Sequence, residues 1–188
     1  LNAYYELGNN INASDTATWN NKKGFEPIGG ETNFNGSIDG QNNIINNISI
    51  DTTDNDVGLI SALGSHGQIT NITLKQANIS GQSGVGGIVG TNYGGSIKNS
   101  KVTGRILGWG SLGGLIGENE GGNSVESETS VTVIGSGRNV GGLIGRSING
   151  EIKRSDTSGS VEGGEYVGGL IGSSQDIIIT AYSKATVN

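Results

Sequence analysis

The stretch VGGLIG stands at Val140–Gly145 and returns unchanged at Val167–Gly172, with glycine at half of its positions. Three related stretches precede it, beginning at Val57 (VGLIS), Val85 (VGGIVG) and Leu112 (LGGLIG). The five starts are separated by 28, 27, 28 and 27 residues. A fixed period of roughly 20–50 residues is the sequence signature of a repeat architecture, in which each unit packs on its neighbours.

Each repeat has the pattern of short strands rather than of helices. Its apolar residues do not recur at helical spacing, and the units are rich in glycine, threonine and β-branched residues. A helical repeat would contain series of Ala, Leu, Glu and Lys, and a propeller blade would need about 40 residues or more. We therefore predict an all-β fold, a β-solenoid with coils of about 27–28 residues whose neighbours lie ~4.8 Å apart.

Further positions recur after each of these stretches. We assign a second apolar column to Ile69, Ile97, Val125, Ile152 and Ile177, and a third to Ile106, Ile134 and Val161. Between them we place a mixed column of Leu74, Val102, Ser130, Thr157 and Tyr182. In a solenoid such columns are expected to run along the stack and to form one continuous core.

The adjacent Leu and Ile of VGGLIG raise a question of direction. Strand alternation places Val140 and Ile144 on one face and Leu143 on the other, so Leu143 and Ile144 cannot both point inward from a straight strand. A bend or a covering segment is the simpler explanation. The alternative is an exposed apolar stripe, which would mark a binding surface with Leu143 as a candidate ligand contact. The column in question contains Leu59, Ile88, Leu115, Leu143 and Leu170.

The first 56 residues differ from the repeats and hold most of the aromatic side chains, among them Trp19 and Phe34. We interpret residues 1–56 as N-terminal leading coils or a cap that is continuous with the solenoid. Residues 57–188 are interpreted as five repeats, the last of them truncated. Because that last unit stops inside a coil, we expect the chain to be part of a longer polypeptide.

The repeat VGGLIG…N…G.I..S...G.V.G resembles the GLUG repeat of bacterial surface proteins. The leading segment, with Trp19, GFEPIG at Gly24–Gly29 and FNGSIDG at Phe34–Gly40, is similar to the leader of filamentous-haemagglutinin-like exoproteins. The resemblance implies a right-handed parallel β-helix within a large secreted or surface-displayed adhesin. Related repeats also occur beside the catalytic domains of some bacterial surface proteases. The unit at 112–139 lacks the usual Asn-Ser step, which puts the regularity of that coil in question.

Composition excludes several classes of function. The chain has 188 residues, a net charge of −6 and no cysteine. Phosphate binding needs clustered Lys and Arg, so we expect no nucleic-acid partner. The lack of cysteine removes disulfides, thiolate metal sites and cysteine nucleophiles. No apolar run reaches about 18 residues, so we expect no membrane span in this segment.

A carbohydrate-active β-helix would need convergent carboxylates, or Ca²⁺-binding carboxylates beside a basic residue. Acidic side chains occur in three short groups, Asp51, Asp54 and Asp56, then Glu118 and Glu120, then Glu162 and Glu165. Each group is local and typical of a solvated loop, so we predict no catalytic residue and no cofactor. A structural Ca²⁺ at the first group is the alternative, although the oxygen spacing of an EF-hand loop is missing.

Two single residues need a separate interpretation. His66, the only histidine, lies in the turn LGSHGQ, and a zinc site or a Ser-His-Asp triad would have to be built around it. We interpret it as a surface loop residue. Trp109, between Gly108 and Gly110, either covers a coil corner or is an exposed ligand contact that stacks on a sugar or anchors a partner.

The sequence therefore predicts a non-catalytic β-helical segment of a secreted or cell-surface adhesin, which serves as a rigid stalk and adhesive surface. Its expected partner is a host or bacterial cell-surface protein or glycan. Two alternatives stay open. The chain is an accessory domain of a larger surface enzyme such as a protease, whose chemistry lies outside these residues, or it is a carbohydrate-active β-helix.

Overall fold

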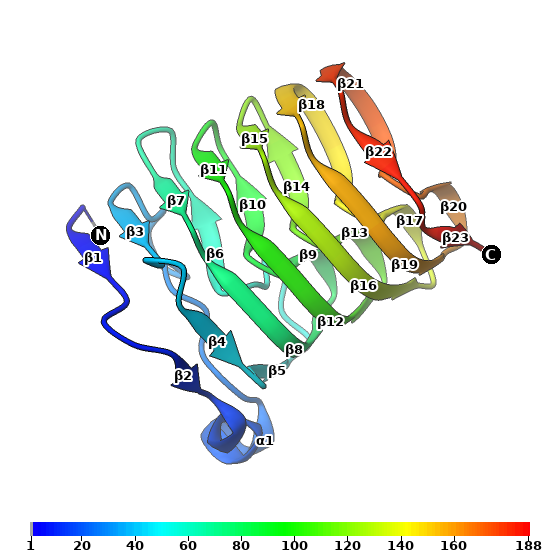
Figure 1. Ribbon diagram of the computed structural model, residues 1–188. Coiled ribbons are helices and arrows are strands. Elements are labelled where there is room, and N and C mark those ends of the chain that lie inside the picture. Colours follow the sequence, from blue (N-terminus) through cyan, green and yellow to red (C-terminus); the bar gives the residue numbers. More distant parts are fainter. Residues whose placement is uncertain (1) are drawn as a thin grey trace.

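The computed structural model describes residues 2–188, with the exception of the side chain of Ile179. Figure 1 shows the coils stacked side by side from the N terminus to the C terminus, each strand lying against the equivalent strand of the next coil. Every pairing between the named strands of the described residues is parallel. The predicted all-β solenoid is confirmed.

Within residues 2–188 the strands form three sheets that run along the stack. The ten-stranded sheet has two rows that meet in the long strand β18 (Ile144–Lys153), which also pairs with β21 (Ile171–Ile179). One row contains β1 (Tyr4–Glu6), β3 (Ser37–Asp39), β7 (Gln68–Thr70), β11 (Ser96–Lys98) and β15 (Asn123–Val125). The other row contains β6 (Ile60–Leu63), β10 (Val89–Asn92) and β14 (Ile116–Glu120).

Two further sheets complete each coil. The nine-stranded sheet contains β2 (Ile11–Asn12), β4 (Ile44–Asn46), β5 (Ser49–Asp51), β8 (Thr73–Ser80), β12 (Lys101–Gly108), β16 (Glu128–Gly135), β19 (Asp156–Glu162), β22 (Tyr182–Ser183) and β23 (Thr186–Val187). The four-stranded sheet contains β9 (Ser83–Gly86), β13 (Gly110–Gly113), β17 (Arg138–Gly141) and β20 (Glu165–Gly168). The strands of this last sheet end with the first two residues of the last four glycine-rich stretches.

The N-terminal segment winds into the same stack. Strand β1 pairs with β3, which pairs with β7, and β2 pairs with β4. Between β2 and β3 lie the 3₁₀ turn η1 (Ser14–Thr18) and the short turn α1 (Trp19–Lys22), which project at one corner of the first coils (Figure 1). Phe34 is fully buried, with its ring centroid 6.1 Å from that of Tyr5. This segment therefore shares its core with the repeats.

Inward-facing columns build the core. Ile60, Val89, Ile116 and Ile144 align across four coils, and all four side chains are fully buried. Burial of a side chain of this size stabilises the fold by roughly 1.5–3 kcal/mol. Because each coil covers the column below it, the same residues bury the core and fix the register between coils.

One predicted core position is wrong by a single residue in the coil that begins at Leu112. Ser124, and not Val125, aligns with Ile97 and Ile152, and its side chain is fully buried. The same shift affects the two later columns of this coil, where Thr129 and Val133 hold the inward positions predicted for Ser130 and Ile134. In the last coil Ile178 and Ser183 take the places predicted for Ile177 and Tyr182.

These shifts have one physical cause. In the coil that begins at Leu112 the prediction took the apolar Val125 in place of its neighbour Ser124, and the repeat spacing then carried the one-residue error into the later columns. Strand alternation instead places the small polar residues Ser124 and Thr129 inward. Such a residue is tolerated where its hydroxyl finds a backbone partner. Thr129 has such a partner, because its Oγ1 donates to the Gly142 carbonyl oxygen at 2.8 Å, whereas the buried Ser124 Oγ has no hydrogen-bond partner among the described residues.

The chain turns sharply within VGGLIG. Strand β17 ends at Gly141 and β18 begins at Ile144, with a bend at the two residues between them. The bend lets Leu143 and Ile144 both point into the core, where each is fully buried. Leu143 is therefore inaccessible, and its interpretation as a candidate ligand contact is wrong. The alternative explanation, a bend, is confirmed.

Each glycine of VGGLIG permits a different close approach. A Cβ at Gly141 would lie 2.0 Å from the Ile144 carbonyl oxygen, across the bend itself. A Cβ at Gly142 would lie 2.1 Å from the carbonyl oxygen of the equivalent glycine, Gly169, in the next coil. A Cβ at Gly145 would lie 2.5 Å from a backbone nitrogen of β13. No other residue fits where backbone atoms pack this closely.

The coil at 112–139 is regular because the residues at one corner of the solenoid have the same backbone conformation in successive coils. The corner residues Asn71, Asn99, Glu126 and Arg154 all have a left-handed backbone, with φ of 57°, 48°, 55° and 45°. The serines that follow three of them, Ser100, Ser127 and Ser155, are buried, and each hydroxyl donates to the carbonyl two residues earlier. Glu126 thus replaces asparagine without disturbing the pairing of β15 with its neighbours.

Candidate functional site

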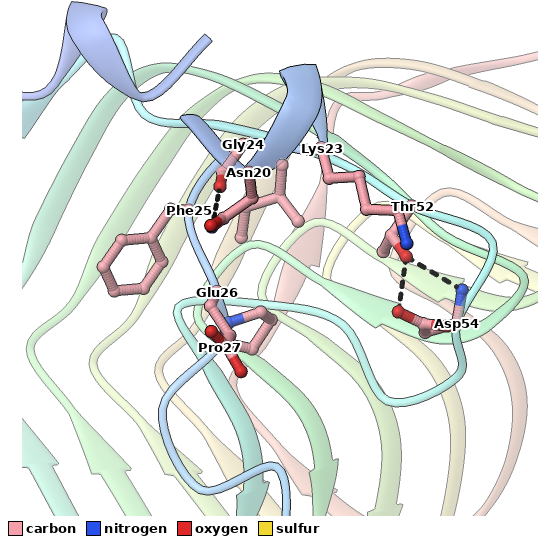
Figure 2. A pocket seen from close by; sticks show the side chains of 9 residues that line it. Asn20, Lys23, Gly24, Phe25, Glu26, Pro27, Thr52 and Asp54 are labelled. Atoms are coloured by element: carbon pink, nitrogen blue, oxygen red, sulfur yellow. Dashed lines mark hydrogen bonds between the residues drawn. The ribbon is translucent and has the colours of Figure 1, made fainter. Parts of the chain in front are cut away.

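A cavity of about 310 Å³ lies where the N-terminal segment crosses the loop after β5 (Figure 2). Asn20 Nδ2 donates to the Gly24 carbonyl oxygen at 2.9 Å, and Thr52 Oγ1 donates to the Asp54 carboxylate at 2.5 Å. In Figure 2 Lys23 reaches toward Thr52, while Glu26 turns to the opposite side. The cavity is mixed in charge, and its polar groups partly satisfy one another.

A second cavity, of about 350 Å³, opens between the start of β9 and the outward face of β10 and β14. Its wall includes Asp56, whose Oδ1 accepts a hydrogen bond of 2.5 Å from Thr91 Oγ1, and Glu118. Tyr93 lies beside them, and burial raises the pKa of its phenol, with Asp56, Glu120 and Glu118 raising that pKa further. The fold thus brings Asp56, which precedes the first glycine-rich stretch, near Glu118 and Glu120 of β14.

One guanidinium faces these carboxylates from the next coil. Arg146 Nη1 lies 3.9 Å from Glu118 Oε2 and 4.0 Å from Glu120 Oε1. Ion pairs of this length between partly exposed groups contribute little stability. The groove is therefore an acidic surface with one cationic side chain, well suited to hydrogen-bond a polar ligand.

The Asp51, Asp54 and Asp56 carboxylates, predicted as the alternative calcium site, have separate partners. Asp51 Oδ1 accepts from Ser80 Oγ and Asp54 Oδ2 accepts from Thr52 Oγ1, both at 2.5 Å, while Asp56 pairs with Thr91. Among the described residues no three His, Asp or Glu side chains are grouped so that they could hold a metal ion. The structure therefore does not bring this group together.

The remaining predicted residues lie apart from these cavities. His66 is exposed in the turn after β6, where its Nδ1 lies 3.3 Å from Ser65 Oγ. Glu165 Oε2 pairs with Arg138 Nε at 2.8 Å, and Glu162 is exposed at the end of β19. Trp109 is 61% exposed between β12 and β13. Its side chain lies at the coil corner, and both of its interpretations, as a cover of that corner and as a ligand contact, stay predictions.

Two surface carboxylates make stability depend on acid pH. Hydrogen bonding by Arg154 lowers the pKa of Glu126, and hydrogen bonding by the Asn71 side chain lowers the pKa of Asp39. A lowered pKa in the folded state gives stability that is present above the unfolded pKa and is lost as the pH falls through the folded pKa.

We therefore expect the free energy of unfolding to decline as the pH falls below the ordinary carboxyl range. The double variant D39N/E126Q should show a shallower decline in urea unfolding measured across this range. A variant that retains the wild-type slope would contradict the assignment of these two groups.

The fold and its repeats define the class, a parallel β-solenoid that carries the GLUG motif, which residues 81–107 match. Over 109 residues, or 56% of the chain, the sequence is 43% identical to halomucin of Haloquadratum walsbyi, and this match spans 1% of halomucin. A crystal structure from Bacteroides ovatus, described as a candidate immunoglobulin A1 protease, matches with a TM-score of 0.81 and 21% identity over 98% of this chain and 60% of its own. The last likeness establishes the fold alone.

Sequence reasoning missed Tyr93, Arg138 and Tyr166 as surface groups of interest. The signal that could have found Arg138 and Tyr166 is their position in the repeat. Tyr166 aligns with Asn139, which aligns with Ser111, and Trp109 lies two residues before Ser111. Because the repeats alternate between 27 and 28 residues, these alignments become certain only when the strand register is known.

Proposed function

We propose that the chain is a non-catalytic, rod-like segment of a surface-displayed or secreted GLUG-repeat protein, which acts as a rigid stalk and adhesive surface in the manner of filamentous-haemagglutinin-like adhesins. The observation that carries the proposal is the uninterrupted stack of parallel strands from β1 to β21. Each coil is hydrogen-bonded to and packed on the next, so the rod holds outward side chains at a fixed spacing of ~4.8 Å. This geometry suits repeated, weak contacts with a cell surface.

The outward columns support an adhesive function. Opposite charges pair between neighbouring coils at several points, as in Lys101–Glu128 and Arg138–Glu165, each at 2.8 Å. Exposed pairs of this kind contribute about 0–1 kcal/mol to stability, so they are free to exchange partners with a ligand. The expected partner is a protein or glycan of a host or bacterial cell surface.

Beads coated with the chain test this proposal. We expect them to be retained on host or bacterial cell surfaces under flow, and retention should fall when soluble chain is added as competitor. Beads coated with the heat-unfolded chain serve as the control. Cleavage of a surface polysaccharide or protein by the purified chain would contradict a non-catalytic function.

An accessory position in a larger enzyme is the second candidate. It is favoured by the likeness to the Bacteroides ovatus structure described as a candidate immunoglobulin A1 protease, of which the chain matches 60%. Under this alternative the chain binds immunoglobulin A1 without cleaving it, which a pull-down with the purified antibody measures.

No helix in the described part of the chain is long and apolar enough to cross a membrane.

A further inference from the structure

Trp109 lies at a coil corner that the following coils leave uncovered. The residues stacked above it are Gly137 and Gly164. A Cβ at Gly137 would lie 2.1 Å from the Trp109 carbonyl oxygen and 3.2 Å from the ring atom Cδ2. The indole therefore lies beside the next coil where no side chain covers it, and it stays 61% exposed.

An exposed ion pair adjoins these two glycines. Arg138 and Glu165, which follow them by one residue, pair across neighbouring strands, with Nε 2.8 Å from Oε2. Their side chains are 65% and 59% exposed. The two charges neutralise each other, and the exposed Glu162 carboxylate three residues before Glu165 is the further charge at this end of the corner. The remaining guanidinium N–H groups and carboxylate lone pairs are available to a ligand.

Tyr166 is a second exposed aromatic side chain, and its backbone has the left-handed conformation that tyrosine rarely adopts. It follows Glu165, has φ of 55° and is 60% exposed. The equivalent residues of the preceding coils are small, and all share the left-handed backbone, Gly84, Ser111 and Asn139. The left-handed backbone is usual at the corners of these coils, as at Glu126 and Arg154, and an aromatic side chain adopts it less readily than asparagine does. Burial of the ring does not offset the strain, since most of the ring is exposed.

We propose that Trp109, Arg138, Glu165 and Tyr166, hereafter the Trp109 platform, bind a neutral oligosaccharide. The proposal rests on the adhesive function above and names its ligand class. Aromatic faces stack on the C–H faces of pyranose rings, and the ion pair supplies donors and acceptors for hydroxyl groups. The one guanidinium is paired and the further charge, Glu162, is negative, so the surface has no complement for a uronate or a sulfated glycan.

The spacing of the platform favours an oligosaccharide over a single sugar. Trp109 and Tyr166 belong to coils two repeats apart, which places them ~10 Å apart along the stack. Gly137 in the coil between them, and Gly164 in the coil of Tyr166, have no side chain at the position that aligns with Trp109. A ligand that spans both aromatic side chains gains from two contacts whose positions the rigid coils fix in advance.

Calorimetric titration of the folded chain tests the platform. The neutral probes are cellohexaose, maltohexaose and N-acetylchitohexaose; an oligogalacturonate is the anionic probe and oligolysine the cationic one. We expect at least one neutral hexasaccharide to bind and W109A to weaken that binding by about tenfold or more. The matched control is W19A, because Trp19 is the other tryptophan and is 49% exposed in the N-terminal segment. It should leave the affinity unchanged.

A second variant separates binding from folding. Asparagine adopts the left-handed backbone readily, so Y166N should keep or raise the melting temperature while it weakens the hexasaccharide. Tyr182→Ala, at an exposed tyrosine of β22 in the last coil, should not change the affinity. Opposite movements of stability and affinity in Y166N are the mark of a strained ligand contact.

Three results would overturn the platform. These are the binding of no neutral hexasaccharide, unchanged affinity in W109A, or tighter binding of the oligogalacturonate or oligolysine than of every neutral probe. The adhesive function is judged separately. Coated beads that adhere without binding any glycan reject the platform alone, whereas hexasaccharide binding without bead retention rejects the adhesive function alone.

Discussion

Replacement of Gly113 by alanine is expected to lower the free energy of unfolding by about 3 kcal/mol or more. A Cβ at this position would lie 2.0 Å from the Ile116 carbonyl oxygen and 2.7 Å from the backbone nitrogen of Gly145 in the next coil. Both atoms belong to packed backbone and cannot rotate aside. Relief of the clash would require the bend between β13 and β14 to open, which would expose the core column beneath it.

Urea unfolding followed by circular dichroism measures this loss, and the same strand offers a control. A Cβ at Gly110 would meet nothing closer than Ser83 Oγ at 3.6 Å and the Arg138 carbonyl oxygen at 3.8 Å, which are ordinary contacts. Gly110→Ala should therefore change the free energy of unfolding by less than about 0.5 kcal/mol. Equal losses in G110A and G113A would show that glycine serves the flexibility of the chain rather than the close approach of its backbone.

The solenoid is predictable from sequence because its period comes from glycine, which the geometry of the bend strictly requires. Hydrophobicity alone was a poorer guide. It assigned Val125 to the core in place of Ser124, because Val125 is apolar and directly follows the small, buried Ser124. The bend itself needed the structure, because alternation in a straight strand cannot place both Leu143 and Ile144 inward.

The candidate surfaces were predictable only in part. Trp109 is conspicuous because glycines flank it, whereas the side chains beside it come from later coils. Val133 aligns with Ile106 and Val140 aligns with Leu112, but the segment between the two aligned positions is one residue longer in the later coil. The alignment of the side chains beside Trp109 depends on where this additional residue lies. A difference of one residue reverses which side chains of a strand face outward. Only the register of the strands therefore places Arg138 and Glu165 in the coils that stack on Trp109, one residue after the glycines that align with it.

A ladder of buried side-chain amides makes Asn119 the most sensitive polar position that we identify. Asn119 is 1% exposed, and its Nδ2 donates to the Gly122 carbonyl oxygen at 3.0 Å and to Ser147 Oγ at 2.8 Å. Its Oδ1 accepts a hydrogen bond of 3.0 Å from Asn92 Nδ2 in the preceding coil. The side chain therefore joins three coils through donors and an acceptor that water cannot replace.

Asn119→Asp is expected to lower the free energy of unfolding at neutral pH by roughly 3–5 kcal/mol, since it buries a charge and removes both donors. Burial raises the folded pKa of the new carboxyl above its unfolded value, so protonation favours the folded state. The deficit relative to wild type should therefore shrink as the pH falls through that raised pKa. Asn123→Asp, at an exposed residue of β15, should cost less than about 0.5 kcal/mol. A deficit in N119D that matches N123D, or that does not change with pH, would mean that water reaches the ladder.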